Sequence, residues 1–220
     1  MEKFVLIMAG GSGTRMGGDI PKQFLEINGK PLILHTISRF LEFDPDINLV
    51  VVLPPGQFSR WHECCKTHAF CRSHLLIPGG SERFFSVKNG LEPISRDGIV
   101  FIHDAVRPLV SRDTLERCDR GAAEKGNAIP VWPVNESLRK TESGRNFAVD
   151  RASYFLVQTP QTFQAALIKN AYNQAYQTGF TDDASVLEAT GEPVNLVAGN
   201  RENIKVTFPS DLTTAGALLT

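Results

Sequence analysis

The chain has 220 residues, 42% of them hydrophobic and 21% charged, so it can bury one sizeable core and lacks the composition of a disordered or fibrous protein. Its 23 basic and 24 acidic residues give a formal net charge of −1, which argues against a protein that coats nucleic acid. The longest apolar runs, 4–9 and 47–53, are too short to span a membrane, and the N-terminus has no signal-peptide pattern. We therefore expect a soluble, cytoplasmic protein with a single domain over 1–220 that binds neither membranes nor nucleic acid.

Apolar runs and amphipathic stretches alternate along the chain as far as Pro133. Short runs rich in Val, Ile, Leu and Phe predict strands at Lys3–Ala9, Asn48–Leu53, His74–Ile77, Ile99–Ile102 and Ala128–Trp132. Apolar residues at helical spacing predict helices at Pro31–Phe43, Ser59–Cys71, Glu82–Pro93 and Asp113–Lys125. This alternation predicts an α/β fold with a mostly parallel sheet and helices on both faces.

The alternation stops after Pro133. The segment Asn135–Arg151 is polar and charged, with Gly144 near its middle, and two interpretations stay open: a disordered loop, or a β-hairpin arm that packs on a neighbouring molecule. Regular structure is expected again further on, with an extended segment at Tyr154–Gln158, helices over Gln164–Gln177 and Asp182–Ala189, a strand near Val194–Val197 and a helix after Pro209.

The four cysteines are too few and too unevenly spaced for a disulfide framework. Cys64, His68 and Cys71 lie on one stripe of the predicted helix Ser59–Cys71, where a zinc ion could in principle bind. A short helix cannot surround a tetrahedral metal alone, and no second pair of ligands with suitable spacing occurs elsewhere in the sequence. We therefore expect this stripe to pack against the protein and not to bind a metal.

The loop after the first predicted strand is rich in glycine and reads Ala9-Gly10-Gly11-Ser12-Gly13-Thr14-Arg15-Met16-Gly17-Gly18. Open parallel sheets bind ligands at the carboxyl ends of their strands, and glycines let backbone N–H groups approach a phosphate closely. The pattern is neither a P-loop nor the dinucleotide fingerprint. Because Arg15 lies inside the loop and Lys22 follows seven residues later, we expect a polyphosphate site here.

A second polar cluster, His103-Asp104-Ala105-Val106-Arg107-Pro108, follows another predicted strand. A carboxylate at this place either caps the next helix or binds Mg²⁺ beside phosphates, and its expected closeness to the glycine-rich loop favours Mg²⁺ for Asp104. Arg107 is able to fork onto a second phosphate, whereas His103 is interpreted as structural. Lys205, on a predicted short strand among apolar residues, is expected to reach an anion. Thr181 precedes two acids at the start of a predicted helix, so we interpret it first as the N-cap and second as a substrate contact.

These motifs resemble those of the sugar- and polyol-phosphate nucleotidyltransferases, beginning with 10–16 and Pro21-Lys22-Gln23-Phe24. Further motifs narrow the resemblance to the 2-C-methyl-D-erythritol 4-phosphate cytidylyltransferase family: Gly79-Gly80-Ser81-Glu82-Arg83 with Ser86, His103–Pro108, Val149-Asp150-Arg151, Gln158-Thr159-Pro160-Gln161, Thr181–Glu188 and Asn203–Thr207. The matching blocks run in order from residue 4 to about residue 215.

The resemblance implies a Rossmann-like fold and a homodimer that uses Mg²⁺ to condense CTP with the polyol phosphate, releasing diphosphate, in non-mevalonate isoprenoid biosynthesis. It implies that Arg15 and Lys22 stabilise the pentacoordinate α-phosphate, that Arg151 and Lys205 are also catalytic, and that Asp104 binds the metal. The implied CTP contacts are Ala9, Gly10, Gly11, Gly13, Gly79, Gly80, Ser86, Asp104 and Ala105. The implied contacts of the polyol phosphate are Arg107, Ser137, Arg151, Thr159, Thr181 and Lys205, with Ser137 and Arg151 reaching the partner's site from a dimerisation arm at about 135–151.

Two departures from the family pattern bear on these roles. The chain has Gly10 where the family often has alanine, a change that should be tolerated, and Ser137 where threonine is common. The ribitol-5-phosphate cytidylyltransferases share the glycine-rich loop and Gln158–Gln161, so they stay open as an alternative. A non-catalytic nucleotide-binding regulatory subunit is a third interpretation, and the presence of Arg15, Lys22 and Asp104 argues against it.

Overall fold

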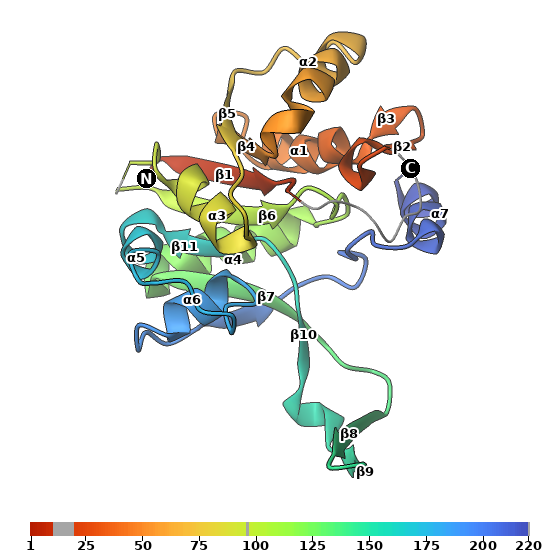
Figure 1. Ribbon diagram of the computed structural model, residues 1–220, viewed down its shortest axis with the longest axis vertical. Helices are drawn as coiled ribbons and strands as arrows, with labels where there is room; N and C mark the ends of the chain where they lie inside the picture. Colours follow the sequence, from red (N-terminus) through yellow and green to blue (C-terminus); the bar gives the residue numbers. More distant parts are fainter. Residues whose placement is uncertain (11–19, 96, 220) are drawn as a thin grey trace.

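A computed structural model describes residues 1–10, 20–95 and 97–219 of the chain. Within these residues a central sheet has eight strands in the order β10-β7-β11-β6-β1-β4-β5, with β12 paired to β7 (Figure 1). The strands are β1 (Lys3–Met8), β4 (Asn48–Leu53), β5 (His74–Pro78), β6 (Ile99–Asp104), β7 (Asn127–Pro133), β10 (Phe155–Val157), β11 (Gln161–Gln164) and β12 (Leu196–Ala198).

Most neighbouring strands of the sheet run parallel. Strand β1 pairs in parallel with β4 and β6, β4 with β5, and β7 with β12, whereas β10 and β11 are antiparallel to their neighbours. The predicted α/β fold with a mostly parallel sheet is confirmed. Parallel strands are covered on both faces, which explains why residues 49–53 of β4 are apolar and buried without interruption.

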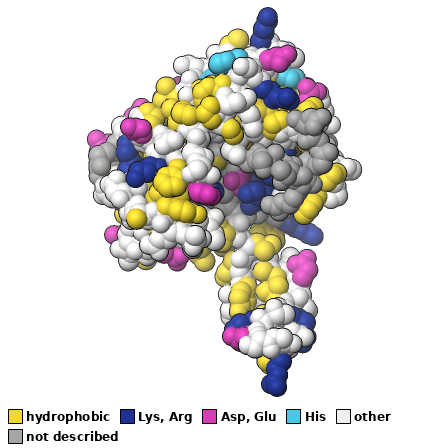
Figure 2. Space-filling view, viewed as in Figure 1, with side chains coloured by type: hydrophobic (Ala, Val, Ile, Leu, Met, Phe, Trp, Pro, Cys, Tyr) yellow, Lys and Arg dark blue, Asp and Glu magenta, His cyan; other side chains and the backbone are white. Residues whose placement is uncertain are grey.

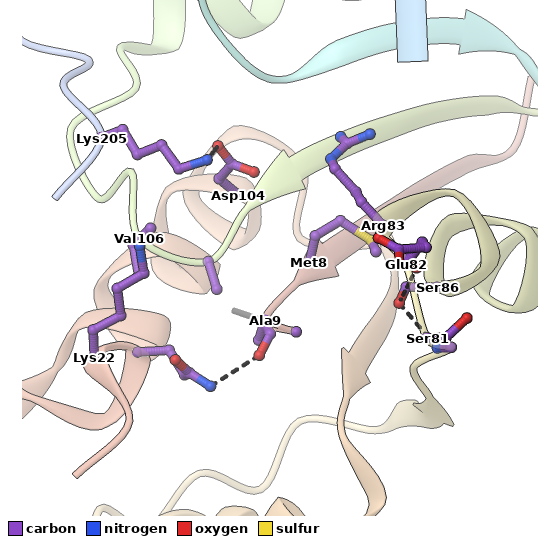
Figure 3. A pocket seen from close by; sticks show the side chains of 14 residues that line it. Met8, Ala9, Lys22, Ser81, Glu82, Arg83, Ser86, Asp104, Val106 and Lys205 are labelled. Carbon is purple, nitrogen blue, oxygen red and sulfur yellow. Dashed lines mark hydrogen bonds and ion pairs between the residues drawn. The ribbon is translucent and has the colours of Figure 1, made fainter. Parts of the chain in front are cut away.

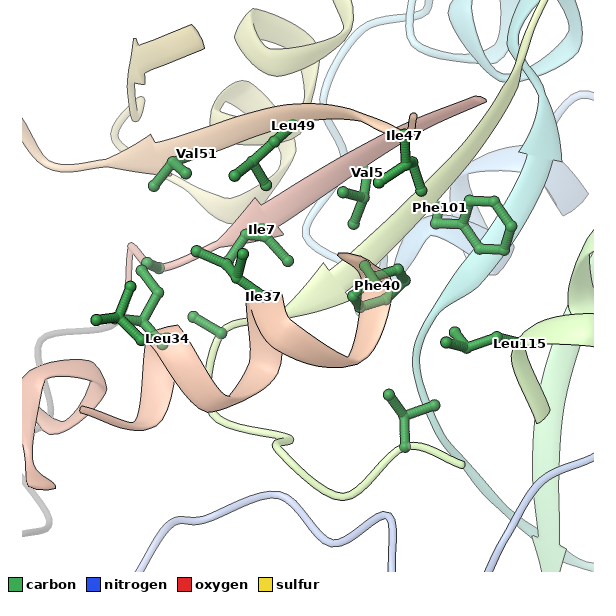
Figure 4. Close-up of a cluster of buried hydrophobic side chains, with 14 of the residues drawn as sticks. Val5, Ile7, Leu34, Ile37, Phe40, Ile47, Leu49, Val51, Phe101 and Leu115 are labelled. Atoms are coloured by element: carbon green, nitrogen blue, oxygen red, sulfur yellow. The ribbon is translucent and has the colours of Figure 1, made fainter. Parts of the chain in front are cut away.

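Helices cover both faces of the sheet, as the alternation predicts. One face carries α1 (Leu32–Phe43), α2 (Phe58–Thr67) and α4 (Arg112–Lys125), and the other carries α3 (Arg83–Leu91), α5 (Ala165–Ala171) and α6 (Asp183–Glu188). Successive residues of β1 alternate between the two cores: Val5 and Ile7 pack with α1, as Figure 4 shows, while Leu6 and Met8 pack with α3. Among the described residues, none of the helices has the length and apolar character needed to cross a bilayer.

A third, smaller core holds the C-terminal part of the chain against the loop after β6. It includes Val106 of that loop, Val206, and Ala215 of the C-terminal helix α7 (Pro209–Leu218). Ile27 of the short strand β2 (Glu26–Ile27), which pairs with β3 (Lys30–Pro31), also belongs to it. The Val206 N–H donates a hydrogen bond of 2.9 Å to the Val106 carbonyl. This bond places the neighbouring residue, Lys205, beside the end of β6.

The polar segment after Pro133 forms a β-hairpin, which is one of its two predicted alternatives. Strands β8 (Leu138–Glu142) and β9 (Arg145–Val149) pair antiparallel, and Figure 1 shows them projecting away from the body of the molecule. Ser143 and Gly144 join them with φ angles of 49° and 76°, because a tight two-residue hairpin turn requires positive φ at both positions.

Strand β11 was not predicted, and the helix predicted over Gln164–Gln177 is shorter in the structure. The helix α5 covers only the first part of that range, and β11 inserts between β6 and β7. Its first residue, Gln161, is buried, and its side-chain amide is satisfied at the start of α6: Nε2 donates to Asp182 Oδ2 at 2.7 Å and Oε1 accepts from the Ala184 N–H at 2.8 Å. A buried strand with satisfied polar side chains lacks the apolar pattern by which strands are recognised.

The predicted helix Ser59–Cys71 is also shorter in the structure. Helix α2 ends at Thr67, and Ala69 has a φ of 49°, a left-handed conformation that stops the helix. Cys71 is exposed beyond the helix end while Cys64 is buried within it. The predicted stripe of Cys64, His68 and Cys71 is therefore wrong.

Candidate active site

A cavity of about 300 Å³ opens where β1 and β6 end, at the carboxyl edge of the parallel sheet (Figure 3). Ligands of open α/β sheets bind at this edge. The cavity is lined by the end of β1, the segment before β2, the loop before α3 with the start of α3, the end of β6 and the segment before α7. The lining residues are Met8, Ala9, Gly10, Lys22, Gln23, Gly80, Ser81, Glu82, Arg83, Ser86, Asp104, Ala105, Val106 and Lys205.

Many of the predicted site residues meet in this cavity. Those that line it are Ala9, Gly10, Lys22, Gly80, Ser86, Asp104, Ala105 and Lys205. Arg15, Gly11 and Gly13 lie outside the described residues. Arg107 and Thr159 contact Asp104 from outside the lining, and Gly79 adjoins Gly80.

Asp104 is the last residue of β6 and is surrounded by cations. Its Oδ2 lies 3.1 Å from Lys205 Nζ and 3.3 Å from Arg107 Nε. Burial opposes ionisation of this carboxyl, but the charges of Lys205, Arg107 and Arg83 hold its pKa well below the ordinary value. Asp104 is therefore a carboxylate at any pH at which the protein would work.

Lys205 pairs with an anion of the protein itself, the carboxylate of Asp104. The predicted short strand around it does not form: residues 203–207 are irregular and are held by the Val206 hydrogen bond to the loop after β6. About half of the Lys205 side chain (48%) stays exposed, so its ammonium group faces both Asp104 and the cavity.

His103 is fully buried behind Asp104 and links two of the site's segments. Its Nε2 lies 3.0 Å from the Arg107 carbonyl oxygen, which can only accept, so Nε2 carries the proton. Its Nδ1 then accepts from the Thr159 hydroxyl at 3.0 Å, and the Thr159 oxygen accepts the Asp104 N–H at 3.2 Å. Burial lowers the pKa of His103 to about 4, so the ring is neutral near pH 7. These contacts agree with a structural role.

Replacing His103 with asparagine tests that role. The unfolded chain binds a proton at this histidine near pH 6.5 and the folded chain only near pH 4, so wild type loses up to about 3 kcal/mol of stability as pH falls between these values. We expect His103→Asn to abolish most of this loss and to keep kcat/KM within about tenfold of wild type, because the buried ring makes its contacts to the Arg107 carbonyl and the Thr159 hydroxyl and does not line the cavity. Denaturant unfolding at neutral pH and about pH 5, with steady-state kinetics, measures both effects.

Two outcomes would contradict this assignment. One is an unchanged pH dependence of unfolding in the variant. The other is a loss of activity above about a thousandfold in a variant with normal fold and normal affinity for the nucleotide that the resemblance implies, which would mean that the ring takes part in the chemistry.

The loop before α3 is held by Ser86. The Ser86 hydroxyl, nearly buried, accepts the Gly80 N–H and donates to the Glu82 carbonyl, both at 3.0 Å. A Cβ atom at Gly80 would lie 2.4 Å from Phe85 Cβ and 3.1 Å from the Phe85 carbonyl carbon, so only glycine fits there. At Gly10 the nearest atom of the described residues to an added Cβ would be Ser86 Oγ at 3.9 Å, so these residues leave room for the alanine that the family often has there.

We expect Gly80→Ala to distort the cavity wall. The clash at Phe85 has to be relieved by a shift of the backbone, so we predict a loss of about 1–3 kcal/mol of stability and at least a tenfold rise in the KM for the nucleotide that the resemblance implies. Gly56→Ala is the matched control, since an added Cβ there meets no atom within 4 Å. Thermal unfolding and steady-state kinetics of the two variants check this prediction, and equal behaviour of both would refute it.

Two cavity residues, Gln23 and Arg83, received no role from the sequence. Arg83 opens α3 and forks onto Asp183, with nitrogen–oxygen distances of 2.7 and 2.5 Å, and the Tyr172 hydroxyl donates to the same carboxylate at 2.6 Å. A cation in the first turn of a helix is unfavourable unless an anion pairs with it. An arginine in the first turn of a predicted helix therefore indicates that some acid pairs with it. The sequence does not tell which acid that is, and in the structure it is Asp183, one hundred positions away.

Thr181 does not cap the helix that follows it, so our first interpretation of it is wrong. The N-cap of α6 is Asp182, whose carboxylate accepts the Ser185 N–H at 2.9 Å while the Ser185 hydroxyl contacts the Asp182 backbone. Thr181 is exposed just before this cap and does not line the cavity.

The two predicted site residues near the arm also lie away from the cavity of their own chain. Ser137 is exposed, and Arg151, at the base of the hairpin, donates to the Asn135 carbonyl. Apolar side chains gather along the neck of the arm in Figure 2, where Phe155, Leu156 and Val157 of β10 are between 46% and 54% exposed.

The fold and the site define an α/β nucleotidyltransferase. The model of the family described as "IspD: 2-C-methyl-D-erythritol 4-phosphate cytidylyltransferase" matches residues 4–220, and the chain belongs to this family. It is 51% identical over 220 residues to the 2-C-methyl-D-erythritol 4-phosphate cytidylyltransferase of Bacteroides fragilis and 48% identical over 219 residues to that of Phocaeicola vulgatus, with full coverage of both chains in each case. The crystal structure of the Thermus thermophilus enzyme of this name is 34% identical, with a TM-score of 0.77 over 99% of this chain and 98% of that one. The Francisella tularensis enzyme superposes with a TM-score of 0.82 at 28% identity over 100% of both chains.

Proposed function

We propose that the protein transfers the cytidylyl group of CTP to the phosphate of 2-C-methyl-D-erythritol 4-phosphate and releases diphosphate, in non-mevalonate isoprenoid biosynthesis. Membership of the family over nearly the whole chain supports this activity. The observation that carries it is the cavity at the ends of β1 and β6, where Lys22, Lys205 and the ionised Asp104 line the same space. Such a group of charges suits a triphosphate that reacts with a second phosphate.

The reaction joins an oxygen of the acceptor phosphate to the α-phosphorus of CTP and breaks the bond from that phosphorus to the diphosphate. The acceptor oxygen is already ionised at neutral pH, so the protein needs no general base. The neutral, buried His103 fits this scheme because it presents no proton acceptor to the cavity. Lys22, with Arg15 by resemblance, would stabilise the negative charge that develops on the α-phosphate.

The carboxylate of Asp104 is suited to bind Mg²⁺. This carboxylate is ionised, and the two described cations that contact it share Oδ2, which leaves Oδ1 without a described partner. Mg²⁺ in phosphate-transferring sites takes one or two carboxylates and completes its shell with phosphate oxygens and water. When bound, it would neutralise phosphate charge and polarise the α-phosphoryl group.

The acceptor would lie on the Lys205 side of the cavity. Lys205 and Arg107 both stand beside Asp104, and either can exchange part of that contact for the acceptor phosphate. Thr159 is buried with its hydroxyl between His103 and the Asp104 N–H, so its contribution would pass through Asp104. Thr181 is assigned to the acceptor by resemblance alone.

We also propose a homodimer in which the arm of each subunit enters the partner's active site. The exposed apolar side chains of β10 and the arm would be covered in such a dimer. Ser137 and Arg151 are exposed and do not line the cavity of their own chain, which suits residues that act on a partner's substrate.

A diphosphate-release assay tests the activity. With CTP and Mg²⁺ we expect turnover with 2-C-methyl-D-erythritol 4-phosphate, little with ribitol 5-phosphate and none without an acceptor. Preferred turnover of ribitol 5-phosphate would replace the acceptor assignment. Tight CTP binding with no turnover of either acceptor would instead support the regulatory subunit.

A further inference from the structure

The segment that carries Lys22 is attached to the sheet through Gln23. Gln23 is the middle residue of a short 3₁₀ helix, η2 (Lys22–Phe24), and only 1% of it is exposed. Its side-chain Nε2 donates to the Ala9 carbonyl at 2.8 Å and to Gln57 Oε1 at 2.6 Å. An amide nitrogen has two hydrogens, so both donors are used by these partners.

The two partners belong to the ends of neighbouring strands. Ala9 directly follows β1, and its own N–H donates to the Val52 carbonyl of β4 at 2.9 Å, which extends the pairing of these strands to the cavity. Gln57 ends η3 (Pro55–Gln57), the turn that follows β4. Gln23 therefore connects the Lys22 segment to a fixed part of the sheet, and Figure 3 shows Lys22 and Ala9 on the wall of the same cavity.

A second anchor of the same segment is apolar. Phe24 is buried in the core that includes α1 and holds the backbone against it. Apolar burial is non-directional, whereas the hydrogen bonds of Gln23 depend on both distance and angle. The two neighbours thus do different things: Phe24 keeps the segment on the protein, and Gln23 sets where Lys22 stands relative to the end of β1.

We propose that Gln23 is a positioning residue of the transfer reaction, which acts through Lys22 by fixing the Lys22 segment to the Ala9 carbonyl. This inference rests on the proposed function, in which Lys22 stabilises the α-phosphate in the transition state. A group that must meet developing charge loses much of its effect when it is displaced by about 1 Å.

Gln23→Met tests the proposal, because methionine has a similar volume and no donor. We expect kcat to fall by about 10²-fold while the KM for CTP stays within about threefold of wild type. Gln57→Met removes one partner and leaves the bond to Ala9, so its kcat should fall by less than about fivefold. Phe24→Leu, the matched apolar control, should lower the melting temperature with kcat within about threefold of wild type.

The decisive experiment combines Gln23→Met with Lys22→Ala. If Gln23 acts through Lys22, adding Gln23→Met to Lys22→Ala lowers kcat by no more than about twofold. If the loss of kcat in the double variant equals the product of the losses in the two single variants, the proposal is overturned and Gln23 is a structural residue. A normal kcat for Lys22→Ala alone would show that the role of Lys22 in the proposed function is wrong, and this single variant separates the two failures. If Gln23→Met does not fold, Gln23→Asn, which keeps the amide on a chain one methylene shorter, takes its place in the same cycle with the same criterion.

Discussion

Replacing Lys22 with alanine is expected to lower kcat by about 10²–10³ while the KM for CTP changes by less than about threefold. Lys22 lines the cavity that also contains Asp104 and Lys205. Negative charge on the α-phosphate oxygens increases in the transition state, so a preorganised ammonium group there stabilises the transition state more than bound CTP. Steady-state kinetics over a range of CTP concentrations at saturating acceptor separates kcat from KM.

Lys30→Ala is the matched control for this variant. It removes the same charge from the same part of the sequence, but Lys30 donates to Ser38 at 2.5 Å and does not line the cavity. We expect its kinetics to stay within about threefold of wild type. A Lys22→Ala enzyme with a raised KM and a nearly normal kcat would mean that Lys22 binds CTP equally in the ground state and the transition state, and our assignment would be wrong.

The second large effect is expected from mixing two inactive variants. In the homodimer that we propose, Arg151→Ala and Lys22→Ala subunits should each be nearly inactive when paired with themselves. If Arg151 acts in the partner's site, a heterodimer contains one site with both changes and one site with neither. Random mixing makes about half of the dimers heterodimers, so activity should recover to roughly a quarter of wild type.

The alternative is that Arg151 acts within its own chain. Every site of a heterodimer then keeps one of the two changes, and no activity returns. Native mass spectrometry measures subunit exchange independently of activity, and a mixture of Lys22→Ala with a second Lys22→Ala preparation is the negative control. Confirmed heterodimers without recovered activity would reject the action of Arg151 across a dimer.

Local pattern was enough to predict the parallel strands of the sheet and to place Lys22 and Asp104 at one edge of it. The apolar runs of β1, β4 and β6 are buried on both faces, and their alternation with amphipathic helices marked them as parallel strands with helices on either side. Because such strands end at one edge, Asp104 and Lys22 were expected to lie together, and they line one cavity. The end of helix α2 was misjudged because the left-handed conformation of Ala69 leaves no signal in the apolar periodicity. Strand β11 was missed because its buried polar side chains do not give the apolar pattern of a strand.

By itself the sequence determined which residues are apolar enough to form the core, where the backbone has the glycines to approach a phosphate, and which charged groups stand at the ends of strands. Only the tertiary structure decided the partners of the buried polar groups. Gln23 bonds to residues 14 and 34 positions away, and Arg83 to one 100 positions away. The physical reason is that burial of an amide or a charge requires a partner, while nothing in the local pattern says which one the fold brings near. The same holds for the arm, whose hairpin follows from pairing between β8 and β9 and whose exposed apolar neck becomes visible only once the rest of the chain has packed.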